Sequence, residues 1–100
     1  MIKHIVIWSL KDTDNGKSKQ SNALLIKQKL EALQGKIPGL LKIEVGTDIS
    51  LTANSGDIVL YSEFESKLSL AQYQGHPEHQ AIVPFIAECC SARQVVDYEI

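Results

Sequence analysis

The chain has 100 residues, a formal net charge of −2 at pH 7 and a hydrophobic fraction of 44%. This length supplies one domain with one core, and so small a domain often relies on a partner to complete its burial. No run of lysine and arginine is present, which excludes the basic surface that nucleic-acid binding needs. The apolar start Ile5–Trp8 is too short for a signal sequence or a membrane span, so we expect a cytoplasmic protein without membrane contact.

The first predicted element is a strand over residues 2 to 10, where β-branched residues alternate with period two. Both of its sides are apolar at the centre, with Val6 and Trp8 on one side and Ile5 and Ile7 on the other. Both faces of the sheet must therefore be covered. His4 shares the side of Trp8, and an imidazole there needs a polar partner or a wet cavity.

A loop and a helix are predicted next. Residues 11 to 16 are rich in Asp, Thr, Asn and Gly and predict a loop. Residues 21 to 34 place apolar side chains at spacings of three and four, which predicts a helix that starts near Lys17. We expect Gly35 to end this helix.

Three further strands complete the predicted sheet. Alternation over residues 40 to 49 and 57 to 64 predicts two strands, joined by a polar connection with a turn at residues 54 to 56. Residues 93 to 100 predict the last strand.

A second helical region is predicted between Ser66, its expected N-cap, and residue 88. Gly75 interrupts it and Pro77 restarts it, because proline fits the first turn of a helix. We expect Pro84 to kink or shorten the second part.

Two histidines flank this interruption and mark the most reactive stretch of the chain. His76 is the expected N-cap of the restarted helix, and His79 lies in its first turn. Helical spacing puts His79 near Ile82 and Val83, which points its ring at the interior. His79 is thus better placed for chemistry than His76.

The element order predicts an α+β fold of the ferredoxin-like βαββαβ type, with a four-stranded antiparallel sheet and helices on one face. Two helical regions cover only one face of such a sheet. The other face must then pack against a second sheet, so we predict a symmetric homodimer through the sheet faces that forms a dimeric α/β barrel.

Several segments carry a resemblance to a known family. They are the start Met1–Val6, the segments Ile37–Leu40, Val45–Asp48 and Phe64–Ser66, and the Tyr-x-x-His-Pro-x-His pattern of Tyr73–His79. Together they span essentially residues 1–100, and the chain resembles a single stress-responsive A/B barrel (Dabb) domain. Haem- or quinone-type monooxygenases use a similar dimeric barrel, but the Tyr-x-x-His-Pro-x-His pattern favours the Dabb family.

The resemblance also implies candidate site residues. One branch, the plant polyketide cyclases, closes a linear chain by aldol condensation without metal or organic cofactor. The resemblance to this branch implies that His79 acts as the base and that Tyr73 holds and polarises the substrate, with His4 lining the pocket. Where these cyclases have a further pocket histidine, this chain has Ile58. Trp8 and His76 complete the predicted substrate pocket, for which the expected occupant is a small apolar molecule.

Other interpretations stay open at this point. Histidine titrates near neutral pH and a tyrosine hydroxyl donates to a developing enolate, so His79 and Tyr73 suit a cofactor-independent lyase or cyclase. The same residues, together with His4, also suit a hydrogen-bonded network in a purely structural dimer.

Two further side-chain groups have a simple interpretation. A metal held by His76, His79 and His4 lacks further ligands at suitable spacing, and we expect none. Cys89 and Cys90 are expected to be free, partly buried thiols.

Overall fold

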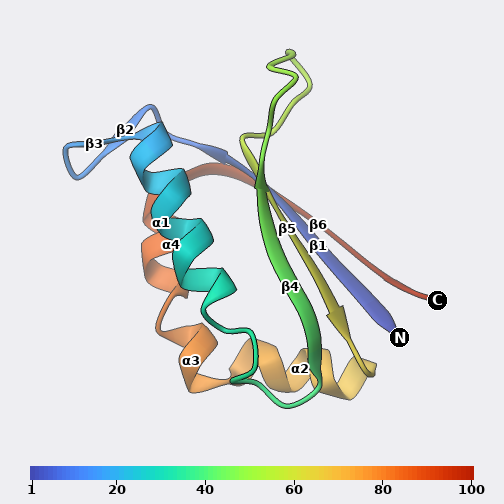
Figure 1. The fold of residues 1–100 in the computed structure, drawn as a ribbon. Coiled ribbons are helices and arrows are strands. Elements are labelled where there is room, and N and C mark those ends of the chain that lie inside the picture. The colour runs from blue at the N-terminus through green and yellow to red at the C-terminus, as the bar shows by residue number, and fades with distance from the viewer.

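A computed structural model describes residues 1–100 and shows an α+β fold of the predicted ferredoxin-like type (Figure 1). The four-stranded sheet has the order β4-β5-β1-β6, and all of its neighbouring strands are antiparallel. The elements are β1 (Ile2–Leu10), β2 (Thr13–Asp14), β3 (Lys17–Ser18), α1 (Lys19–Glu31), β4 (Leu40–Thr47), β5 (Ile58–Phe64), α2 (Lys67–Gly75), α3 (Pro77–Gln80), α4 (Val83–Cys89) and β6 (Cys90–Glu99).

The core lies between the sheet and the helices, which Figure 1 shows on one side of the strands. Strand β1 is an inner strand of the sheet and buries alternate residues, as the period-two pattern predicted. Ile26 and Leu30 of α1 are fully buried against the sheet, and so is Phe64 at the end of β5. One cluster of twenty buried hydrophobic residues joins all these elements.

The helices cover the sheet unevenly. Val95 of β6 pairs with Val6 of β1 and so faces the helices, yet it is 38% exposed. The helical layer therefore ends before it reaches the edge strand β6, and this edge of the inner face stays open.

No helix covers the opposite face of the sheet (Figure 1). Ile7 is 40% exposed there. On β6, Val96 and Tyr98 pair with Ile5 and Lys3 of the same face and are 59% and 43% exposed. As the sequence predicted, a single chain leaves an apolar sheet face in contact with solvent.

The predicted loop over residues 11 to 16 is wrong in part. Two short strands, β2 and β3, pair there as a hairpin, with Asn15 at φ 53° and Gly16 at φ 74°. Positive φ at both central residues is typical of the two-residue turn that Asn-Gly favours, so the signal was present in the sequence.

Two helix predictions also need correction. Helix α1 ends at Glu31 instead of Gln34. In the turns that follow, backbone hydrogen bonds span three residues instead of four, as between Leu33 N and Leu30 O at 3.0 Å. The region after Pro77 is not one kinked helix. It forms two helices, α3 and α4, and Pro84 lies in the first turn of α4, where its missing N–H costs nothing.

Strand boundaries differ from the prediction by at most three residues, since β4 ends at Thr47 and β6 starts at Cys90. None of the helices combines the length and apolar character needed to cross a membrane.

Two glycines with nearly the same positive φ allow a test of the packing of α2. Gly35 and Gly39 have φ values of 82° and 81°, but only at Gly39 would a Cβ atom come within 2.6 Å of Ser69 Cβ, which is fixed to the backbone of α2. Gly35→Ala adds backbone strain alone and should lower the free energy of unfolding by about 1–2 kcal/mol. Gly39→Ala adds a clash and should lower it by about 2–5 kcal/mol.

Urea denaturation of both variants measures the difference. Equal losses for the two substitutions would mean that α2 does not approach the chain at Gly39 as closely as described.

Candidate functional site

The break between α2 and α3 is built as the sequence predicted. Ser66 is the N-cap of helix α2, its hydroxyl accepts a hydrogen bond from Ser69 N at 3.1 Å, and the helix ends at Gly75. His76 then adopts an extended conformation and its Nδ1 accepts a hydrogen bond from Glu78 N at 3.1 Å. The ring nitrogen of His76 therefore caps the start of α3, as the sequence predicted.

This break brings His79 against the last turn of α2. The centroids of the Tyr73 and His79 rings lie 4.3 Å apart. His79 Nδ1 lies 3.3 Å from the carbonyl oxygen of Gln74, and a carbonyl only accepts, so Nδ1 carries the proton. Nε2 is then the nitrogen with a free lone pair, as a general base requires.

Tyr73 is the most confined polar side chain of the site. It is 1% exposed, and its hydroxyl has no hydrogen-bond partner. Phe64 packs against it with ring centroids 4.9 Å apart. Burial raises the pKa of Tyr73 to about 12, so the hydroxyl keeps its proton at neutral pH and is a donor without an acceptor.

Burial also sets the charge of His79. The ring is half-buried, and this partial loss of water lowers its pKa below 6.5. The hydrogen bond to the Gln74 carbonyl acts in the opposite direction but is the weaker effect. His79 is therefore neutral at pH 7. The pair consists of a neutral imidazole and a protonated phenol in van der Waals contact.

His4 finds its polar partner on the neighbouring strand and not in the histidine–tyrosine pair. It is buried, and its Nδ1 donates to Oδ1 of Asp97, which lies opposite it in the β1–β6 register. The His4 and Tyr73 rings meet edge to face at 6.2 Å. The predicted hydrogen-bonded network of Tyr73, His79 and His4 is thus wrong, because these rings pack without a hydrogen bond between them.

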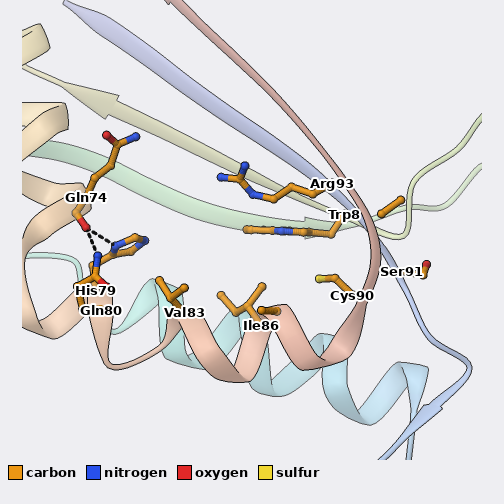
Figure 2. A pocket seen from close by; sticks show the side chains of 11 residues that line it. Trp8, Gln74, His79, Gln80, Val83, Ile86, Cys90, Ser91 and Arg93 are labelled. Atoms are coloured by element: carbon orange, nitrogen blue, oxygen red, sulfur yellow. Dashed lines mark hydrogen bonds between the residues drawn. The ribbon is translucent and has the colours of Figure 1, made fainter.

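A slot of about 530 Å³ opens beside His79, between α4 and the open edge of the sheet (Figure 2). Trp8 of β1 and Arg93 of β6 lie on its sheet side, and Val83 and Ile86 of α4 lie across from them. Its lining residues are Trp8, Gln74, His79, Gln80, Val83, Ile86, Ala87, Cys90, Ser91, Ala92 and Arg93. The walls are largely apolar, and the polar groups of α2 and α3 gather at one end.

The slot contains only two of the six predicted site residues, Trp8 and His79. Tyr73 contacts the His79 ring and is buried behind it, and His4 is buried behind Tyr73. The other two, Ile58 and His76, do not line the slot. Ile58 pairs with Trp8 across the strands but lines a separate, smaller hollow of about 220 Å³, while His76 caps α3.

Nine of the eleven slot residues are not among the predicted site residues, and three of them, Gln74, Cys90 and Arg93, bear on the chemistry of the slot. Gln74 contributes through its backbone carbonyl, which accepts from both His79 and Gln80 (Figure 2). Arg93 enters the slot because β6 pairs with β1 in the register that sets it opposite Trp8. Periodicity places Arg93 on one of two faces, but the register that selects its neighbour is a tertiary property.

The side chains of the site offer no cluster of three or more His, Cys, Asp or Glu that could hold a metal ion. Cys89 is buried and Cys90 is half-buried, and both are free, as expected. Burial raises the pKa of both thiols, that of Cys90 to about 11, so they are protonated and weakly nucleophilic at neutral pH.

The lowered pKa of His79 has a measurable consequence. The unfolded chain takes up a proton near the ordinary value of 6.5, whereas the folded chain does so only at lower pH. The free energy of unfolding should therefore fall as the pH drops below 6.5, and His79→Gln should remove this part of the slope. NMR titration of the His79 ring protons should give a midpoint below 6.5; a midpoint at or above 6.5 would contradict the burial described here.

One family model matches nearly the whole chain, and several solved structures share its fold. The profile of the Stress responsive A/B Barrel Domain (Dabb) matches residues 2–100. A dimeric protein of unknown function with a ferredoxin-like fold from Bacteroides fragilis is 37% identical, with a TM-score of 0.87 over 99% of this chain and 95% of that one. A dimeric ferredoxin-like protein of unknown function from Thermobifida fusca is 25% identical, with a TM-score of 0.84 over 99% and 90%.

A hydroxynitrile lyase from Passiflora edulis shares the fold at 21% identity, with a TM-score of 0.82 over 99% of this chain and 92% of that one. No curated protein matches the sequence. The profile match over residues 2–100 establishes that this chain belongs to the stress responsive A/B barrel (Dabb) family.

Proposed function

We propose that this protein binds a small, largely apolar molecule in the slot between α4 and the β1–β6 edge. The observation that carries the proposal is the slot itself, whose volume of about 530 Å³ falls in the range typical of small-molecule sites. Trp8, Val83 and Ile86 offer apolar contact along its length. Polar groups at one end, with His79 among them, are suited to orient the occupant.

The unpaired hydroxyl of Tyr73 supports the same proposal. A buried hydroxyl without a partner costs about 1–3 kcal/mol, and native structures rarely keep such a group without a use for it. A polar ligand atom placed beside His79, whose ring contacts Tyr73, would supply the acceptor that this hydroxyl lacks.

The single tryptophan of the chain, Trp8, lines the slot and reports on binding. Saturated alcohols, ketones and acids of about six to ten carbons should change its fluorescence in a saturable way. Ala87→Phe places a ring in the slot from α4 and should abolish the change, while the fold persists because Ala87 is exposed.

Ala71→Phe is the matched control, because Ala71 is an exposed helical alanine of α2 outside the slot. This variant should bind as the wild type does. If no probe binds to the wild type, the proposal fails and a purely structural dimer becomes the better account.

We also propose that two chains form a homodimer through their uncovered sheet faces. The exposed apolar side chains of that face, Ile7, Val96 and Tyr98, support this arrangement. The protein from Bacteroides fragilis, at 37% identity, is described as dimeric. Two sheets packed face to face would bury these side chains and close an α/β barrel.

Sedimentation equilibrium at micromolar concentration should give twice the 11.1 kDa mass of one chain. Val96→Glu places a charge in the buried interface and should shift the protein toward monomers. Leu24→Glu, at an exposed position of the helix α1, should leave the dimer intact. A wild-type monomer at this concentration contradicts the proposal.

A second candidate function is a cofactor-independent lyase or cyclase in which His79 acts as general base. It is favoured by one observation, the contact between a neutral His79 and a protonated Tyr73. In this account His79 Nε2 removes a proton next to a substrate carbonyl, and the Tyr73 hydroxyl donates to the enolate oxygen that forms. The proton remains on His79 until it is returned to the product.

Deuterium incorporation into heptan-2-one, followed by NMR in deuterium oxide, tests this second candidate. The wild type should accelerate exchange next to the carbonyl, His79→Gln should abolish the acceleration, and Tyr73→Phe should reduce it by about 100-fold. A wild-type rate no greater than that of free imidazole at equal concentration excludes His79 as a base for ketones.

We propose a cytoplasmic location, because two adjacent free cysteines suit a reducing compartment.

A further inference from the structure

Arg93 is the one arginine of the chain, and it stands at the slot. It lies on β6 opposite Trp8, and Figure 2 shows its side chain extending along the slot toward the end where Gln74 and His79 lie. Its guanidinium makes no ion pair. Four lysines elsewhere, Lys11, Lys19, Lys27 and Lys42, each pair with a carboxylate.

No carboxylate lines the slot. Asp97, the next acidic residue along β6, faces the same side of the sheet but is engaged by His4. His79 is neutral at pH 7 and the Cys90 thiol is protonated, for the reasons given above. The guanidinium of Arg93 is therefore the only charged group among the residues that line the slot, and no carboxylate forms an ion pair with it.

We propose that the ligand of the slot is an apolar carboxylic acid, bound as its carboxylate by Arg93. This inference rests on the proposed binding function and names the chemical class of the occupant. The hydrocarbon part lies between Trp8 and the α4 side chains Val83 and Ile86, and the carboxylate meets the guanidinium. Arginine suits this task because its planar fork of N–H donors matches the two oxygens of a carboxylate.

The position of Arg93 along the slot gives the ligand a direction. The guanidinium is directed toward the end where the polar groups of α2 and α3 gather, away from Ser91 and Cys90 (Figure 2). The carboxylate is thus held near His79, and the apolar tail extends between Trp8 and α4. In a site with apolar walls, a single fixed charge selects ligands of the opposite charge, in addition to the selection by shape that the walls provide.

Matched pairs of probes that differ only in charge test the inference. Octanoate is compared with octanamide, and adamantane-1-carboxylate with adamantane-1-carboxamide, by Trp8 fluorescence and by calorimetry at pH 7.5. Charge-assisted hydrogen bonds predict that the wild type binds each carboxylate about 10- to 100-fold more tightly than its amide.

Arg93→Gln should remove this preference, so that each acid binds no more tightly than its amide, whereas Arg93→Lys should keep part of it, since lysine retains the charge without the fork. Lys36→Gln is the control for the overall charge of the protein, because Lys36 is exposed in the turn after α1 and does not line the slot. It should keep the full preference.

The outcomes separate the inference from the function on which it rests. Equal binding of acids and amides to the wild type, or a preference that survives in Arg93→Gln, overturns the role of Arg93 and leaves the slot as a site for neutral ligands. If neither class binds by either method, the inference and the proposed function fail together.

Discussion

The contact between the Tyr73 and His79 rings is the interaction on which the candidate site depends. It joins the last turn of α2 to the first turn of α3, and it exists because Gly75 ends one helix and Pro77 starts the next, with His76 as the cap between them. The same contact buries a tyrosine hydroxyl without a partner and shields an imidazole from water. One local break in the chain therefore produces a neutral base and a phenol donor side by side.

The second constraint is the small amount of helix available to cover four strands. Helix α1 covers the β4 side of the inner face, and the short helices α2 to α4 leave the β6 edge open. The slot occupies that open edge, so the proposed binding site lies where the helices do not cover the inner face of the sheet. On the outer face no helix covers the sheet, and the exposed apolar side chains there account for the proposed homodimer.

Much of the fold could be predicted from the sequence, because strand alternation and helix caps are local signals. Ser66, His76 and Pro77 act as predicted, and the Asn15-Gly16 turn was readable although it was missed. The slot was not predictable in the same way. It depends on the register that sets Arg93 opposite Trp8 and on the formation of α4 as a helix separate from α3. Both follow from packing between distant segments. The same register gives His4 its partner Asp97, where the sequence suggested a network with Tyr73.

The most direct test of the account is the free energy of unfolding of Tyr73→Phe, measured by urea denaturation beside the wild type. If the hydroxyl is an unpaired donor held ready for a ligand, its removal relieves a buried polar group, and the variant should be as stable as the wild type or more stable by up to about 1–2 kcal/mol. Binding of the Trp8 probes should weaken in the same variant. A loss of more than about 1 kcal/mol, with ligand binding unchanged, would show that the hydroxyl stabilises the fold, and it would contradict the central claim that the Tyr73–His79 pair belongs to a binding site.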